Sequence, residues 1–405
     1  MRTEHGAASR FGLGVIVVLY MAHALPLYFY NVAVPAILRS QGVDLRWIGM
    51  LSLLYLPWAF KFLWAPLVDR WHLPALGRRR SWLWLTQLLL LVGILVLAFT
   101  GLDHGLTVFV LVGMWISTIA ATQDIAIDGY TVEALAPAEH RLGSMAQSVG
   151  VALGSMIGGA GVLWLYETRG WTVALLSLAA MSALTLLAVQ QINEVPRPAA
   201  NQRPSVLRAL RRPELRWALL LIVLYRLVEA PAMAMINPLL VDQNWSLTEI
   251  GLLISVGGAG VGMLAAIGAA WLLKQRTAEQ LMHSGWWRTL LYVLLAGLLY
   301  SGVLASSQFG LGALVIALLA LRYIAMTSLY ALFMRLSSRE QAGTDFTLLV
   351  CFELLVFFIG GALSGFLAKG LGYPAYYVAL AIVSALGLLL CRPLLRRFAP
   401  SPSSP

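Results

Sequence analysis

The sequence predicts an all-α membrane protein in which twelve transmembrane helices form two six-helix bundles. Hydrophobic residues make up 60% of the chain and charged residues only 11%, a composition that does not fit a soluble domain of 405 residues. Apolar runs of the length that a bilayer core requires, about 20 residues, follow one another along the chain. The longest polar interruption lies near the middle and separates two similar halves.

The twelve apolar runs are the expected helices. We place them at residues 11–38, 47–69, 81–102, 105–132, 142–166, 171–192, 216–241, 247–273, 287–306, 309–334, 344–368 and 373–395. The first run also fits a cleaved signal peptide, because it follows a short basic lead and contains an A-x-A pattern at residues 22–24. It continues to Ile37 without a break, which is longer than the apolar region of a typical signal peptide, so we expect a mature helix.

Lysine and arginine residues indicate the orientation, since they concentrate in loops on the cytoplasmic side. With the N-terminus inside, 21 of the 28 Lys and Arg residues fall on that side, Arg288 among them, and three lie within helices. Both termini are therefore expected in the cytoplasm. This bias accounts for most of the net charge of +10, so we expect a lipid bilayer and no nucleic acid as a partner.

A polar stretch from Asn193 to Arg216 predicts a linker between two repeats. Residues 1–192 would form the N-terminal bundle, 193–215 a cytoplasmic linker, 216–398 the C-terminal bundle and 399–405 a disordered tail. The halves resemble each other, because LYMAHALP begins at Leu19 and LYRLVEAP at Leu224, an offset of 205. Two parallel repeats with a cavity between them are the plan of many secondary transporters.

Ionisable residues inside the predicted helices are the candidate functional groups, because a charge at the bilayer centre costs about 2.5–3.5 kcal/mol on insertion scales. Asp124 and Asp128 lie four residues apart and share one helix face, with Gln123 and Tyr130 close to it. The two acids form either the ionisable wall of a transport pathway, which loads and releases a proton, or a structural ion pair that only holds helices together.

Depth along the helices suggests partners for these acids. Lys61 and Asp124 lie at about the same height, roughly 12–13 Å above the cytoplasmic ends of their helices at 1.5 Å per residue, and are expected to pair. In the other half, Arg226 and Glu229 are three residues apart and form a local pair. Three further candidates for the pathway lie inside their spans: His23, Arg322 and Glu353. A buried histidine such as His23 is more often structural than functional.

The sequence predicts no cofactor and no metal site. Cys351 and Cys391 both fall in predicted helices, and a metal site there would lack partners. The chain has no GxxxxGK[ST] run for nucleotide binding and no HExxH or GxSxG pattern of a membrane-embedded enzyme. Transport coupled to protons is therefore the expected activity, and a sensor that has a transporter fold but transports nothing is a lower-ranked alternative.

Three motifs in the N-terminal half carry a family resemblance: KFLWAPLVDR from Lys61, GRRRSWL from Gly77 and ATQDIAIDGY from Ala121. They are similar to the AmpG-type branch of the major facilitator superfamily, which includes muropeptide permeases, acetyl-CoA transporters and the RhtX/FptX group of siderophore importers. The resemblance implies a gating latch formed by Asp69, Arg70, Gly77, Arg78, Arg79 and Arg80. The C-terminal copy, WLLKQR at residues 271–276, lacks the acid and the glycine, so we expect only one intact latch.

Within this branch, a compact twelve-helix chain resembles the RhtX/FptX group more than the longer muropeptide permeases. This resemblance implies a monomeric permease of the bacterial inner membrane that imports a ferric siderophore, pyochelin-like and already chelated, with the proton gradient as the driving force. The alternative is an AmpG-type permease for anhydromuropeptides.

Overall fold

The computed structural model describes residues 10–41, 51–101, 105–192, 194, 203–245, 249–250, 252–273, 277–302 and 308–398. Nearly all of these residues are helical, which confirms the all-α class. The predicted tail at residues 399–405 and part of the WLLKQR copy of the latch lie outside the described residues.

Each of the twelve predicted spans overlaps one helix or consecutive helical segments among the described residues. The α-helices are α1 (Arg10–Tyr28), α2 (Val34–Ser40), α4 (Leu56–Phe60), α5 (Ala65–Arg70), α6 (Arg78–Thr100), α7 (Leu106–Ala134), α8 (His140–Ser155), α9 (Val162–Arg169), α10 (Trp171–Gln190), α11 (Val206–Arg211), α12 (Pro213–Arg226), α13 (Glu229–Ala234), α14 (Ile236–Asp242), α16 (Gly258–Leu273), α17 (Thr277–Tyr300), α18 (Gln308–Leu336), α19 (Ala342–Leu371) and α20 (Tyr373–Arg397). The 3-10 helices are η2 (Leu51–Tyr55), η3 (Lys61–Leu63) and η4 (Pro137–Glu139), and the π-helices are η1 (Phe29–Ala33), η5 (Met156–Gly161) and η6 (Leu252–Gly257).

Ten helices in the described part of the chain are long and apolar enough to cross a membrane, and Leu53–Leu63 is a shorter apolar helix. The remaining predicted span is α17, which begins at Thr277, ten residues before the predicted start. Arg288 therefore lies inside this helix and is buried, so its placement at the cytoplasmic end of a span is wrong. The carboxylate of Glu229 lies beside it, which explains why the helix tolerates this arginine.

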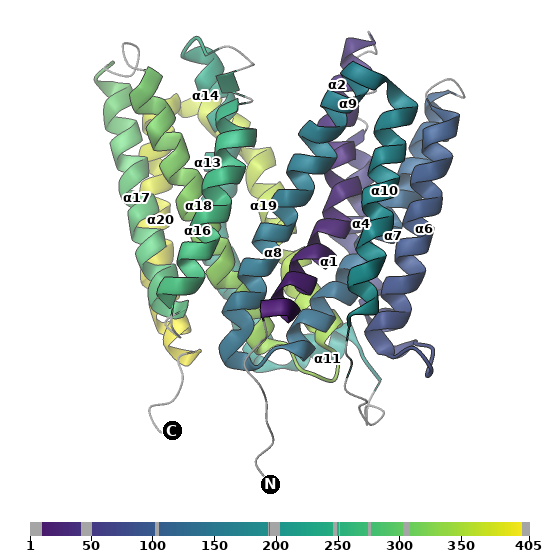
Figure 1. Cartoon of the computed structure of the whole chain (residues 1–405). Coiled ribbons are helices and arrows are strands. Elements are labelled where there is room, and N and C mark those ends of the chain that lie inside the picture. Colours follow the sequence, from purple (N-terminus) through teal and green to yellow (C-terminus); the bar gives the residue numbers. More distant parts are fainter. Residues whose placement is uncertain are drawn as a thin grey trace. The chain divides into compact units, whose positions relative to one another are not determined.

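The chain forms two compact units (Figure 1). Unit 1 contains Met1–Ala209 and Met334–Cys351, and unit 2 contains Leu210–Phe333 and Phe352–Pro405. The change of unit at residue 210 falls within the predicted linker. Residues 334–351, which the sequence places in the C-terminal bundle, group with unit 1 because the start of α19 bonds to α5.

In unit 1, α1 and α8 pack closely side by side (Figure 1). Glycines spaced by four residues make this possible: a Cβ atom added to Gly150 would lie 2.5 Å from the carbonyl oxygen of Val17, and one added to Gly154 would lie 2.5 Å from the Cβ of Ala24. The run GSMIGGAG, which contains Gly154, thus allows the close helix approach that small residues permit in membranes.

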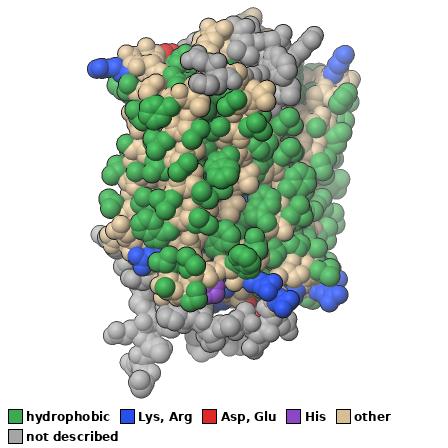
Figure 2. All heavy atoms as spheres, turned by 90° about the vertical axis from the view of Figure 1, so that its right-hand side faces the viewer, with side chains coloured by type: hydrophobic (Ala, Val, Ile, Leu, Met, Phe, Trp, Pro, Cys, Tyr) green, Lys and Arg blue, Asp and Glu red, His purple; other side chains and the backbone are tan. Residues whose placement is uncertain are grey.

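The outer surface of α6 shows how unit 1 meets lipid. Its exposed large hydrophobic residues recur at spacings of three or four: Leu85, Leu88, Val92, Val96 and Phe99. Figure 2 shows a face of the molecule on which hydrophobic side chains cover the middle, while Lys and Arg gather towards the two ends. An apolar band between charged ends is the surface that a multi-pass membrane protein presents to a bilayer.

In unit 2, a break between α12 and α13 places two charges inside a membrane span. Pro231 lacks the backbone N–H that would bond the carbonyl of Leu227, and α12 ends at Arg226. Glu229 then starts α13. Both side chains are buried.

Candidate functional site

Two buried acids on α7 form the centre of a charged cluster in unit 1. Asp124 and Asp128 are both less than 10% exposed, and Lys61 reaches them from η3. The lysine ammonium donates a hydrogen bond to Asp124 Oδ2 and lies 4.0 Å from Asp128 Oδ2. The structure therefore brings together the pair that equal depth predicts, and adds the second acid.

The local sequence explains how Lys61 is positioned. Pro66 has no N–H to bond the carbonyl of Phe62, so a regular α-helix cannot continue through this point, and η3 separates α4 from α5. The backbone N–H of Trp64 bonds the carbonyl of Lys61 at 3.2 Å and closes the 3-10 turn. The lysine thus leaves its helix at a break and faces α7.

Two side chains of α1 complete this group. Tyr20 donates its hydroxyl proton to Asp128 Oδ1 at 2.8 Å, and His23 Nε2 lies 3.4 Å from Asp124 Oδ1. We call Tyr20, His23, Lys61, Asp124 and Asp128 the acid cluster. Both helix α1 residues are buried, and the ring centroid of His23 lies 5.4 Å from that of Trp58.

Gln123 and Tyr130 do not join the acid cluster. The Gln123 amide donates to Gln87 Oε1 at 2.6 Å, and Gln87 donates in turn to Ser182 on α10. Tyr130 lies in a hydrophobic core cluster. The contacts of Gln123 thus link α7, α6 and α10, and the structure places neither residue against the two acids.

A second charged group, the arginine cluster, lies in unit 2. Its members are Arg226, Glu229, Arg288, Arg322 and Glu353. Arg226 donates to Glu229 and, through Nε at 2.6 Å, to Glu353. Arg288 and Arg322 each have one nitrogen 3.4 Å from a Glu229 oxygen. All four unit 2 residues that the sequence singles out, Arg226, Glu229, Arg322 and Glu353, therefore come together.

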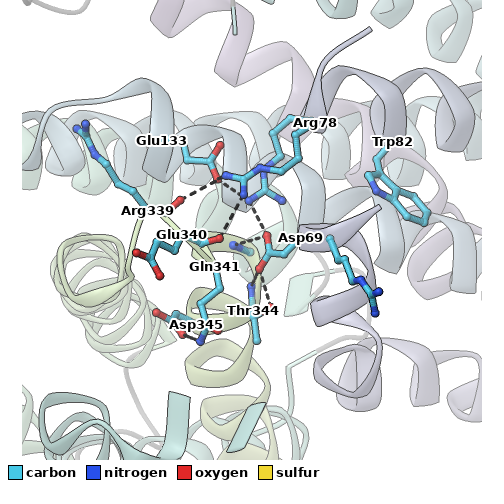
Figure 3. Close-up of polar contacts among 12 residues, drawn as sticks. Asp69, Arg78, Trp82, Glu133, Arg339, Glu340, Gln341, Thr344 and Asp345 are labelled. Atoms are coloured by element: carbon cyan, nitrogen blue, oxygen red, sulfur yellow. Dashed lines mark hydrogen bonds and ion pairs between the residues drawn. The ribbon is translucent and has the colours of Figure 1, made fainter. Parts of the chain in front are cut away.

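The predicted latch centres on Asp69 at the end of α5 (Figure 3). Asp69 Oδ1 lies 2.6 Å from Arg79 Nη2. Its two oxygens also accept the backbone N–H groups of Gly343 and Thr344, at 3.2 and 2.7 Å, at the start of α19. A helix N-terminus favours a carboxylate because its backbone N–H groups lack partners and carry partial positive charge.

Glu133 neutralises the second arginine of the latch, Arg78, and also contacts Arg79. Its carboxylate accepts hydrogen bonds at 2.5 Å from both Arg78 and Arg79, and Arg78 also donates to the carbonyls of Glu340 and Arg339 (Figure 3). Two carboxylates and two guanidinium groups therefore pair without excess charge. The network ties α5, α6 and α7 to the chain just before α19.

Three predicted latch residues occupy other positions. Arg70 is exposed, and no interaction joins it to Asp69. Gly77 precedes α6 with φ +90°, and a Cβ atom there would lie 2.9 Å from a Glu194 oxygen. The backbone N–H of Arg80 donates to the same carboxylate. Gly77 and Arg80 thus shape the start of α6, whereas Arg79 and Arg78 hold the acids.

Sequence reasoning missed several residues of these sites, including Tyr20, Arg288 and Gln341. Gln341 is buried, accepts from Arg208 of the linker helix α11 at 2.7 Å and donates to Asp345 at 2.5 Å. A charge inside an apolar span could have identified Arg288 if the span had been drawn earlier. Neutral Tyr20 and Gln341 give no such signal.

Comparisons with known proteins identify the family. Residues 16–344 match the Major Facilitator Superfamily, and the protein belongs to this superfamily of transporters. The structure resembles that of the Escherichia coli fucose:proton symporter with a TM-score of 0.69 and 13% identity, over 98% of this chain and 100% of that one. It also resembles a bacterial homologue of the iron transporter ferroportin, with a TM-score of 0.65 and 15% identity over 95% and 98% of the two chains. At these identities the likeness shows the fold alone.

Sequence relatives narrow the resemblance to one branch. The anhydromuropeptide permease of Escherichia coli K12 is 29% identical over 396 residues, which span 93% of this chain and 79% of the relative. An uncharacterized protein of Haemophilus influenzae is 27% identical over 91% and 92% of the two chains. A putative transporter AmpG 3 of Rickettsia typhi is 24% identical over 84% and 85%. These relatives support the AmpG-like resemblance and give no support to the RhtX/FptX siderophore group.

Proposed function

We propose that the protein imports anhydromuropeptides into the cytoplasm across the bacterial inner membrane, and that the proton gradient drives this import. The similarity to the Escherichia coli anhydromuropeptide permease over 93% of the chain supports the substrate. The siderophore interpretation depended on chain length, which is not a property of a binding site. None of the sequence relatives supports it. The likeness to a ferroportin homologue concerns the fold and gives no information about the substrate of this protein.

The acid cluster is the observation that carries proton coupling. It holds two carboxylates and one ammonium group, and the five side chains of the cluster are all less than 9% exposed. Burial disfavours an uncompensated charge, so the cluster is balanced when one acid binds a proton. Asp124 is the direct partner of Lys61, and we therefore assign the proton to Asp128.

The geometry suggests how the proton leaves. Lys61 Nζ lies only 4.0 Å from Asp128 Oδ2, while Tyr20 already donates to the other oxygen of the same carboxylate. A small movement of the ammonium group from Asp124 towards Asp128 would stabilise ionised Asp128, because an opposite charge within hydrogen-bond distance favours the charged form. The exchange of one lysine between two acids is thus the proposed coupling step.

Uptake by purified protein in proteoliposomes tests the substrate. With an imposed proton gradient, we expect radiolabelled anhydromuropeptide to accumulate and ferric pyochelin to remain outside. Dissipating the gradient with a protonophore should abolish accumulation. Accumulation of the ferric siderophore without the muropeptide would contradict the proposal and would favour siderophore import instead.

A further inference from the structure

Arg322 differs from the other members of the arginine cluster in its exposure. Its side chain is 28% exposed, whereas those of Arg226, Glu229, Arg288 and Glu353 are at most 5% exposed. It lies fourteen residues from each end of α18, Gln308–Leu336. A guanidinium group at the middle of a membrane span avoids hydrocarbon and faces a partner or a water-filled path. Its exposed part therefore faces either a partner or water and not hydrocarbon.

The two acids of the cluster leave Arg322 only partly neutralised. Three guanidinium groups face two carboxylates, so the described cluster carries one excess positive charge. Arg226 donates hydrogen bonds to both Glu229 and Glu353, and Tyr330 donates to Glu353 as well. Arg322 has a single ionic contact, from Nε to Glu229 at 3.4 Å. Its terminal nitrogens Nη1 and Nη2 have no hydrogen-bond partner among the described residues.

An aromatic ring holds the guanidinium group in place. The Arg322 Cζ atom lies 5.1 Å from the ring centroid of Phe357 on α19, within the range of a cation–π interaction. Contact with the ring and with Glu229 uses one face and one edge of a planar group that carries five N–H donors. The free terminal nitrogens are the pair that binds a carboxylate in a bidentate arrangement.

We propose that Arg322 binds a carboxylate of the transported substrate. This inference rests on the proposed function, because a muropeptide is a sugar joined to a short peptide whose free carboxylates are anionic. The acid cluster and the arginine cluster then bind different ions. The surplus negative charge in unit 1 takes up a proton, and the surplus positive charge in unit 2 takes up the anionic end of the substrate.

Two probes test this assignment: an anhydromuropeptide with free peptide carboxylates, and the same compound with those carboxylates amidated. Wild-type protein should bind the free acid at least about tenfold more tightly, the factor that corresponds to about 1.4 kcal/mol. Arg322→Gln should bind both forms equally, with the affinity for the amidated form unchanged. Arg335→Gln, near the end of the same helix, is the control and should keep the full preference.

The outcomes separate this inference from the proposed function. If wild-type protein binds neither probe, the proposed function fails and the inference fails with it. If wild-type protein binds the muropeptide but Arg322→Gln keeps the preference for the free acid, only the inference is overturned. Should Arg322→Gln not fold, Arg322→Lys keeps the charge beside Glu229 but cannot form two parallel hydrogen bonds, so the preference should fall; an unchanged preference would overturn the inference.

Discussion

Lys61→Met and Asp124→Asn should each abolish proton-driven uptake of anhydromuropeptide in proteoliposomes. Each change leaves a buried charge without its partner, because Lys61 and Asp124 are bonded to each other and both are buried. Removing one member of a buried pair typically destabilises a protein by about 3–5 kcal/mol. Thermal unfolding of the purified variants should therefore show lower melting temperatures alongside the lost uptake.

The double variant separates a coupling role from a structural one. Combining Lys61→Met with Asp124→Asn removes both charges, so the melting temperature should recover. Uptake should stay absent, because no ammonium group remains to stabilise ionised Asp128 and so release its proton. Restored uptake in the double variant would show that the pair only holds helices together. Asp242→Asn, an acid that bonds Tyr373 outside both clusters, is the matched control and should transport normally.

Asp69→Asn should reduce turnover by at least about tenfold while leaving substrate affinity unchanged. The carboxylate bonds Arg79 and two backbone N–H groups at the start of α19, and hydrogen bonds to charged groups contribute about 1.5–3 kcal/mol each. An asparagine keeps the shape but loses the charge that compensates buried Arg79. The latch would then be weakened. The equilibrium between the conformations of the transport cycle would shift, and this shift would slow turnover.

Initial uptake rates and substrate binding, measured on the same preparations, check this prediction. Glu214→Gln makes the same acid-to-amide change at an exposed position in the first turn of α12 and should retain full turnover. Equal losses of binding and turnover in Asp69→Asn would indicate a binding or folding role instead of a latch.

Hydropathy was sufficient to predict the fold class, because the bilayer imposes a length and an apolar composition on every span. It failed for the start of α17, where polar residues such as Glu279, Gln280 and His283 lower the local hydropathy, and the ion pair of Arg288 with Glu229 is invisible in sequence. The depth argument succeeded for Lys61 and Asp124 although η3 interrupts the helix at Lys61, because a single 3-10 turn changes the rise along the helix only slightly. Equal depth was therefore enough to predict this pair without knowledge of how the helices pack.

Direction around a helix was harder to predict than depth. Gln123 and Asp124 are adjacent in sequence and equally deep, yet the first bonds Gln87 and the second Lys61. Successive residues point about 100° apart on a helix, so the partner depends on which neighbouring helix lies on each side. The same limitation hid Tyr20, whose hydroxyl bonds Asp128 from α1. Substrate class was further out of reach, because the siderophore interpretation used chain length, whereas one of the sequence relatives is an anhydromuropeptide permease.

Proton movement during uptake tests the central claim most directly, namely that Asp128 carries the coupling proton. A pH-sensitive dye on the outside of proteoliposomes should report alkalinisation when anhydromuropeptide is added to wild-type protein, because each import event removes protons from that side. Asp128→Asn should bind the muropeptide and exchange it across the membrane without any pH change and without accumulation against a gradient. Substrate-dependent alkalinisation that persists in Asp128→Asn would contradict this account of the acid cluster.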